Sequence, residues 1–220
     1  MNTKISSGIA VCTVTNVNMA IPLENTKNRE FYAIPNFVVQ DTETTGLKCS
    51  SDEIIDIAAI RFRNFQPVDK FSMLLAPKKS IPERITAINH ITDEMVAGCP
   101  CFQQVALSLV EFIGDDNIVG HNLPFDLKFI VHYGADVTTK KRKYYDTLAL
   151  AQKTVKKVKM KWDKELEVYM EDDESEGISN YKLETLCSYF DIINRNAHRA
   201  EGDALATGML FHKLAEIRKG

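Results

Sequence analysis

The chain has 220 residues, of which 45% are hydrophobic and 26% are charged, and its formal net charge is −3. This composition fits one globular domain with a sizeable core and excludes a disordered or fibrous protein. No apolar run approaches the roughly 18 residues that a membrane span needs. The short run from Ile9 to Val14 lacks the basic lead-in of a signal peptide. We therefore expect a cytoplasmic protein with no membrane partner.

Five cysteines, an odd number without paired spacing, do not form a disulfide framework. The segment Cys99-Pro100-Cys101 resembles half of a zinc site, but no second pair of Cys or His completes the four ligands that zinc needs. We interpret all five as ordinary thiols.

The negative net charge argues against a nucleic-acid partner, but two observations weaken that argument. A metal site built from carboxylates adds acidic residues that bound cations neutralise. Basic residues also gather in two clusters, residues 140–143 and residues 153–161. These clusters are explained either as solvated surface lysines or as nucleic-acid contacts, and composition does not separate the two.

The first predicted strand is the apolar run Phe37–Gln40, which ends at Asp41. Ile54–Phe62 and Phe71–Leu75 predict two further strands, with a turn at Asn64–Pro67 between them. Together they indicate an antiparallel meander of three strands. Residues 1–35 lack strong periodicity, so we expect an N-terminal extension followed by one domain over residues 36–220.

After this meander the apolar residues recur at helical spacing. Helices are predicted at residues 82–89, 92–97, 102–113, 124–133, 147–155, 182–190 and 200–217, with short strands at 117–119 and 143–145. Strands followed by alternating strands and helices predict an α/β domain.

The segment from Lys153 to Asn180 is long for a connection inside a small domain, and its composition changes from lysine-rich to acidic. It is either a solvated, mobile loop or an arm that contacts a substrate. We favour the loop, because charge blocks of this kind are usually solvated.

Asp41-Thr42-Glu43 stands at the end of the first predicted strand. Side chains i and i+2 of a strand project from the same face, so the two carboxylates point together. Their repulsion is costly unless a cation lies between them, and such oxygen ligands suit Mg²⁺ or Mn²⁺. Taken alone, the motif is equally well explained by an exposed strand end.

The second motif is Gly120-His121-Asn122-Leu123-Pro124-Phe125-Asp126, which joins a short strand to a helix. Asn122 is placed to cap the helix and Pro124 to begin it. Asp126 then lies in the first helical turn, where the helix dipole favours a carboxylate. A simple capping acid explains this motif when it stands alone.

The third motif is His198-Arg199-Ala200-Glu201-Gly202-Asp203-Ala204. Asp203 falls in the first turn of the last predicted helix, and His198 must lie on the preceding turn to approach it. Histidine titrates near neutral pH and can accept a proton from water. A lone His before a helix is more often a surface residue or a cap.

The three motifs in this order resemble the DEDDh exonuclease family, which includes the proofreading epsilon subunit of DNA polymerase III, RNase T and oligoribonuclease. The resemblance runs from about Phe37 to Leu214, and residues 89–92, 145–148 and 181–186 match accompanying segments of the family. It implies an RNase H-like fold with a mixed five-stranded sheet flanked by helices. It also implies a 3′→5′ exonuclease that releases nucleoside 5′-monophosphates with two Mg²⁺ (or Mn²⁺) ions.

Carried over residue by residue, the resemblance makes Asp41, Glu43, Asp126 and Asp203 the metal ligands and His198 the general base. The positions expected to contact substrate are Thr44, Gly46, Leu47, His90, Asn122 and Phe125. Glu201 departs from the small or apolar residue that is commoner in the family, and it would add a negative charge near the phosphate path.

The expected partner is the 3′ end of a nucleic acid, DNA rather than RNA and single-stranded rather than duplex. RNA trimming, and proofreading beside a polymerase or another replication or repair protein, remain open, because discrimination by the 2′-OH has no sequence motif. A non-catalytic binding module is disfavoured by the five intact chemical positions.

Overall fold

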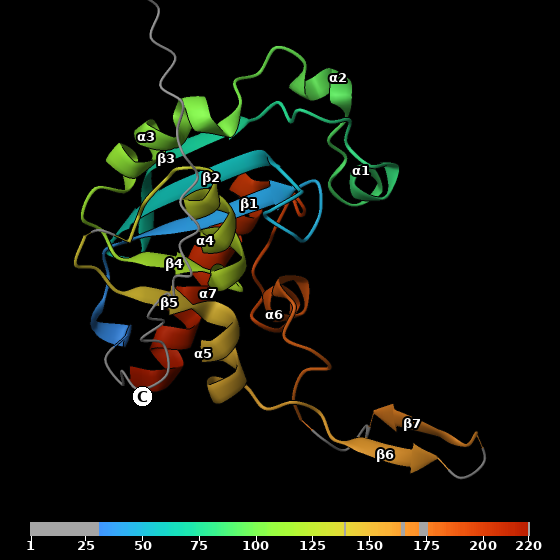
Figure 1. The fold of residues 1–220 in the computed structure, drawn as a ribbon. Helices are drawn as coiled ribbons and strands as arrows, with labels where there is room; N and C mark the ends of the chain where they lie inside the picture. The colour runs from blue at the N-terminus through green and yellow to red at the C-terminus, as the bar shows by residue number, and fades with distance from the viewer. Residues whose placement is uncertain (1–30, 139, 164–165, 172–175, 220) are drawn as a thin grey trace, which may run out of the picture.

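The computed structural model describes residues 31–138, 140–163, 166–171 and 176–219. Its centre is a five-stranded sheet in the order β3-β2-β1-β4-β5 (Figure 1). The strands are β1 (Phe37–Thr44), β2 (Ile54–Arg63), β3 (Gln66–Leu74), β4 (Ile118–Gly120) and β5 (Tyr144–Asp146). The first three strands pair antiparallel, and β1, β4 and β5 run parallel. The predicted mixed five-stranded sheet is therefore confirmed.

Helices cover both faces of this sheet (Figure 1). They are α1 (Glu83–Asn89), α2 (Asp93–Val96), α3 (Phe102–Ile113), α4 (Leu123–His132), α5 (Thr147–Thr154), α6 (Leu183–Tyr189) and α7 (Ala200–Lys219). Phe37 and Val39 pack in one hydrophobic cluster with residues of α7, whereas Val38 packs in a second cluster with residues of α3 and α4. Burial on both faces is the reason why β1 begins as a continuous apolar run.

The edge strand β3 begins at Gln66, five residues before the predicted start at Phe71. Its first five residues are exposed and follow no apolar pattern, so pairing with β2 alone makes them a strand. The turn between β2 and β3 consists of Asn64 and Phe65, both at positive φ, as a tight hairpin turn requires.

Residues 1–30 of the predicted N-terminal extension lie outside the described residues. A short 3₁₀ helix, η1 (Phe31–Ala33), begins the described chain. Phe31 is buried, and its ring centre lies 5.8 Å from that of Phe211 on α7. The packed chain therefore includes residues before the domain boundary expected at residue 36.

Residues 153–180 were expected to form a solvated, mobile loop, and the described part of this segment contains regular secondary structure that the sequence did not predict. It contains an antiparallel hairpin of β6 (Met160–Asp163) and β7 (Val168–Glu171), which extends away from the sheet (Figure 1). The base of the hairpin is held because Val158 N donates to Ile178 O at 3.0 Å and Ile178 N donates to Lys156 O at 3.0 Å. Four-residue strands with flanking charge are too short to give a clear alternating pattern.

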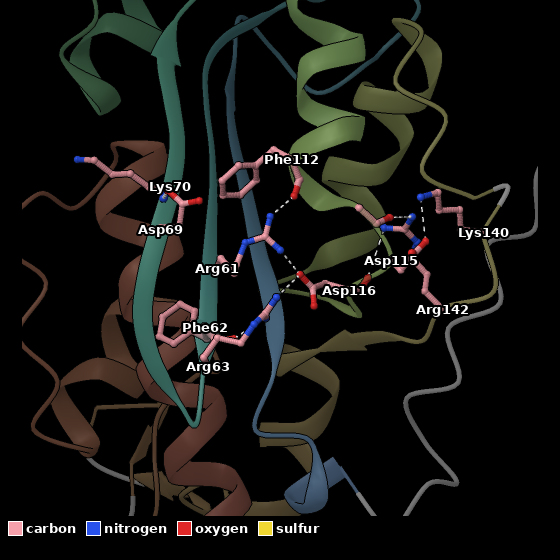
Figure 2. A network of polar contacts seen from close by, with 11 residues as sticks. Arg61, Phe62, Arg63, Asp69, Lys70, Phe112, Asp115, Asp116, Lys140 and Arg142 are labelled. Carbon is pink, nitrogen blue, oxygen red and sulfur yellow. Dashed lines mark hydrogen bonds and ion pairs between the residues drawn. The ribbon is translucent and has the colours of Figure 1, made fainter.

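A network of arginines joins the ends of β2, α3 and β4 (Figure 2). Arg61 and Arg63 both donate to Asp116 Oδ2, the second at 2.8 Å, and Arg61 also donates to the carbonyl oxygen of Phe112. Arg142 donates to the carbonyl oxygen of Gly114 at 2.7 Å. Lys140 forms an ion pair with Asp115 at 2.8 Å.

This network lies at the sheet end where β4 begins. Asp116 precedes β4, and β4 runs parallel to β1, which carries Asp41 and Glu43 at its far end. Two members of the basic cluster 140–143 are therefore bound to groups at the sheet end opposite those carboxylates. Within the described residues, no helix is both long enough and apolar enough to cross a membrane.

We expect Asp116→Ala to lower the free energy of unfolding by about 1–3 kcal/mol, because two partly buried arginines lose their shared acceptor. Asp115→Ala is the matched control: its side chain is 88% exposed, so solvent screens its ion pair and its removal should leave the stability nearly unchanged. Urea denaturation of both variants measures the difference. Equal losses would contradict a structural role for the network.

Candidate active site

Three carboxylates meet at the end of β1 where β4 also ends. Asp41 and Glu43 project from one face of β1, and Asp203 reaches them from the first turn of α7, which packs on that face. One ligand oxygen from each of the three lies within 4.8 Å of the others. The structure thus brings together residues that are separated by up to 162 positions in the chain (203 minus 41).

Asp126 lies beside this group, in the first turn of α4. It is buried, and it accepts a hydrogen bond of 2.5 Å from Thr42 Oγ1, whose side chain projects from the opposite face of β1 to Asp41. Among the charged neighbours of Asp41, Asp126 contributes most to raising the pKa of that carboxyl. The fourth predicted acid therefore lies within electrostatic reach of the other three.

Burial raises the pKa of all four carboxyl groups, and repulsion from other members of the group adds to this for Asp41, Glu43 and Asp126. For Asp41 burial is the main cause, followed by repulsion from Asp126 and Asp203, and together they raise its pKa well above the usual range. Burial raises the pKa of Glu43 to about 7 and that of Asp126 to about 7. The pKa of Asp203 is raised mainly by burial, and a hydrogen bond from Asn194 partly opposes this change.

These four residues fit a divalent metal centre. Their ligand atoms are all carboxylate oxygens, the donors that Mg²⁺ and Mn²⁺ prefer. When all four are ionised they carry a charge of −4, which two divalent cations would balance. The raised pKa values reflect the same crowding of negative charge. When no cation is bound, protons partly neutralise these acids.

His198 lies on the turn before α7, as predicted, and it adopts a left-handed backbone with φ of 62°. This conformation directs its backbone N–H to Asp203 Oδ2 at 3.1 Å. Its imidazole is partly exposed, with Nε2 3.5 Å from Glu184 Oε1 on α6. The side chain is thus close to the carboxylates without being held by a short hydrogen bond.

The turn after β1 contains three of the predicted substrate contacts. Thr44 Oγ1 donates to the carbonyl oxygen of Gly46 at 2.6 Å, so this hydroxyl already has an internal partner. A Cβ on Gly46 would lie 2.6 Å from the carboxyl group of Asp52, which explains why glycine stands there. Leu47 is 83% exposed and is the member of this turn best placed to touch a ligand.

The other predicted contacts differ in their surroundings. His90 is exposed and ends α1 in a left-handed conformation. Phe125 is partly buried, with its ring centre 5.0 Å from that of Phe129, so part of its surface belongs to the core. Asn122 occupies the N-cap position of α4, but its side chain makes no capping hydrogen bond.

The expected capping role of Asn122 is therefore wrong. Its φ is 59° rather than the extended value of a usual N-cap, and its backbone N–H donates to Asp146 Oδ1 at 2.8 Å. The side chain of Asn122 is left exposed beside the motif that carries Asp126.

Sequence reasoning missed the residues that support the carboxylates. Asn89, buried at the end of α1, lies with Nδ2 3.5 Å from Glu43 Oε2, and Asn194 Nδ2 donates to Asp203 Oδ1 at 2.5 Å. Asn89 lies in the segment 89–92 that resembles the family, but the sequence prediction names only His90 of this segment as a site residue. Asn194 lies in a loop with no sequence signal.

Asp56 also supports the site from β2, where it pairs with Glu43 in the sheet register. Its Oδ2 accepts hydrogen bonds from Arg199 Nε at 2.8 Å and from Ala200 N at 3.3 Å, so it caps α7. Glu201 forms an ion pair with Lys70 on β3 at 2.5 Å. The expectation that Glu201 adds an unbalanced negative charge is therefore corrected.

Comparison with known proteins shows similarity along most of the chain. The RNase T family model, described as an exonuclease, matches residues 38–211. DNA polymerase III subunit epsilon of Aquifex aeolicus is 34% identical over 182 residues, which are 82% of this chain and 80% of that protein. A PolC-type DNA polymerase III of Clostridium perfringens is 34% identical over 185 residues, which are 82% of this chain and 11% of that protein.

Among solved structures, exonuclease X in complex with 5′ overhanging duplex DNA has a TM-score of 0.59 and 22% sequence identity. The match covers 82% of this chain and 91% of that chain. At this level of identity the likeness establishes the fold.

We expect the metal-free protein to lose stability as the pH rises from about 4.5 to about 7. Glu43 has an ordinary pKa of 4.5 that is raised to about 7 by folding, so the folded state binds more protons in this window. The free energy of unfolding then falls with rising pH, by up to about 3 kcal/mol from this group. Thermal melting in the presence of a chelator measures the effect.

Glu43→Gln is the control for this measurement, because the amide does not titrate. Its melting temperature should fall less between pH 5 and pH 8 than that of the wild type, as the relation between pKa and stability requires. Parallel pH profiles for the two proteins would show that Glu43 is not the titrating group.

Proposed function

Because the chain belongs to the RNase T exonuclease family, we propose that it removes nucleoside 5′-monophosphates one at a time from 3′ ends of DNA, with divalent metal ions bound to its carboxylates. The motif-based resemblance to this family is confirmed, and with it the exonuclease activity and the RNase H-like fold. The observation that carries the proposal is the convergence of Asp41, Glu43 and Asp203 within 4.8 Å.

In the proposed site, Asp41, Glu43, Asp126 and Asp203 hold two Mg²⁺ or Mn²⁺ ions. When bound, such ions would polarise a phosphodiester and lower the pKa of water, so that loss of a proton to a base gives hydroxide, the better nucleophile. Asn89 and Asn194 hold the carboxylates of Glu43 and Asp203 in place before metal arrives. This preorganisation reduces the loss of side-chain entropy on metal binding.

His198 is the proposed general base, and it accepts the proton of the attacking water at Nε2. This nitrogen lies 3.5 Å from Glu184 Oε1, a contact long enough to be exchanged for a hydrogen bond to water. The backbone hydrogen bond from His198 to Asp203 keeps the base beside a metal-binding acid while the imidazole turns. Leu47, His90, Asn122 and Phe125 are the proposed contacts to the terminal nucleotide.

DNA is the proposed substrate because the relative of nearly equal length is a subunit of a DNA polymerase. The same similarity supports a DNA polymerase as a partner and the cytoplasm as the location. A single-stranded 3′ end is preferred, because unpaired bases are free to stack on apolar side chains such as Leu47 and Phe125.

The test is digestion of 5′-labelled single-stranded DNA, duplex DNA and RNA in the presence of Mg²⁺. We expect single-stranded DNA to shorten from its 3′ end with release of nucleoside 5′-monophosphates, and Asp41→Asn to lose essentially all activity. Far-UV circular dichroism of the variant controls for folding. Products that shorten from the 5′ end, or full activity of Asp41→Asn, would overturn the proposal.

His198→Ala should reduce kcat by about 10²–10⁴, the usual contribution of a positioned base. Its affinity for Mn²⁺, measured by isothermal titration calorimetry, should stay close to that of the wild type because no metal ligand is removed. Loss of Mn²⁺ binding in this variant would instead make His198 a ligand.

A further inference from the structure

The β6–β7 hairpin presents different side chains on its two faces. Trp162 and Tyr169 are direct cross-strand partners, so they share one face, and their ring centres are 4.9 Å apart. Val168 and Met170 flank Tyr169 in β7 and therefore project from the other face. Trp162 is 47% exposed and Tyr169 is 66% exposed, so the aromatic face is open.

An isolated two-stranded hairpin is at best marginally stable in water, and this one has exposed apolar residues on both faces. Nothing among the described residues buries its aromatic pair, since both rings remain about half or more exposed. Large exposed aromatic residues on a projecting arm are typical of a contact surface for another molecule.

Lysines lie mainly on the lead-in to this hairpin, whereas Lys161 in β6 is the partner of Met170 and projects from the face opposite the aromatic pair. Residues 153–161 contain five lysines and no acidic residue, and all five lysine side chains are exposed. The acidic residues of the segment follow from Asp163 onwards, so the charges are separated along the segment: the lead-in to β6 is basic, and the residues from Asp163 onwards are mainly acidic. This basic part is complementary to a polyanion. A purely apolar protein partner would not require the lysines.

The hairpin is connected closely to the candidate active site. Ile178, at its base, pairs with Lys157, and it is six residues before Glu184, whose carboxylate lies 3.5 Å from His198 Nε2. Six residues span at most about 20 Å, so the base of the hairpin lies within that distance of Glu184. A nucleic-acid strand that leaves the site past His198 can therefore reach the hairpin.

We propose that the β6–β7 hairpin is a second binding site for single-stranded nucleic acid, in which bases stack on Trp162 and Tyr169 while the lead-in lysines Lys156, Lys157 and Lys159 contact phosphates. Exposed aromatic rings beside lysines are the combination that binds single strands without sequence preference. The inference rests on the proposed function, because the bound strand is the 5′-ward part of the substrate whose 3′ end lies at the carboxylates.

The first test uses tryptophan fluorescence, because Trp162 is the single tryptophan of the chain. A chelator prevents cleavage, and an oligothymidylate of about 20 nucleotides is titrated into the protein, long enough to span both sites. We expect saturable quenching that weakens as salt concentration rises. Binding of a labelled oligonucleotide, measured by anisotropy, without any change in Trp162 emission would overturn the proposal.

The second test compares Trp162→Ala/Tyr169→Ala with Val168→Ala/Met170→Ala. The matched control also removes apolar side chains from the hairpin, but from the face that cannot stack with the proposed strand. We expect the ratio of kcat/KM for the long oligonucleotide to that for a trinucleotide to fall about tenfold or more in the aromatic variant, since each stacked base contributes strongly to binding. The control should keep the wild-type ratio.

Equal falls in both variants would assign the hairpin a structural role and overturn the proposal. Self-association without DNA that the aromatic substitutions abolish, seen by sedimentation, would assign the aromatic face to a second copy and also overturn it. If the wild type cleaves no nucleic acid while Trp162 is still quenched by oligothymidylate, the proposed function fails but the binding site stands. If the wild type cleaves the oligonucleotide but Trp162 is not quenched, the proposed function stands and the proposed binding site fails.

Discussion

Electrostatic repulsion between carboxylates at one end of the sheet is the constraint to which the rest of this structure is adapted. Burial and mutual repulsion raise the pKa of Asp41, Glu43 and Asp126, so keeping all of them ionised together costs free energy. Bringing these acids together therefore does not stabilise the fold. Their proximity makes sense as a site that gains its full stability when cations bind.

The surrounding structure holds the acids in place through contacts that do not neutralise them. Thr42 donates to Asp126, Asn194 donates to Asp203, and Asp56 caps the helix that delivers Asp203. Each contact satisfies a polar atom that would otherwise be buried alone. The neutral donors fix the positions of the oxygens but leave their negative charge available for a metal.

Three arginines lie away from this site, whereas Arg199 binds Asp56 beside it. Arg61, Arg63 and Arg142 are bound to Asp116 and to backbone carbonyl oxygens at the other end of the sheet, where they join three segments (Figure 2). Lys153 lies in α5, and the exposed lysines of residues 156–161 lie on the lead-in and first strand of the projecting hairpin. The acidic end of the sheet is thus separate from the lead-in lysines that are proposed to contact the substrate.

The sequence by itself determined the sheet and nearly all of its helices, and it supplied the five proposed site residues, because each depends on local pattern. Phe37, Val38 and Val39 are apolar because both faces of β1 are buried, and α3 follows its apolar periodicity from Phe102 to Ile113. Asp41, Glu43, Asp126, His198 and Asp203 stand in motifs short enough to be read as a family resemblance.

Only the tertiary structure decided the contacts between segments that are distant in the chain. Folding brings together the partners in each of these contacts. They are the hydrogen bonds of Asn194 and Asp56, the ion pair of Glu201 with Lys70, and the hydrogen bond from the backbone N–H of Asn122. The start of β3 and the β6–β7 hairpin depend on backbone pairing rather than on side-chain pattern. Such pairings depend on which strand lies alongside, and a linear pattern of residue types does not contain that information.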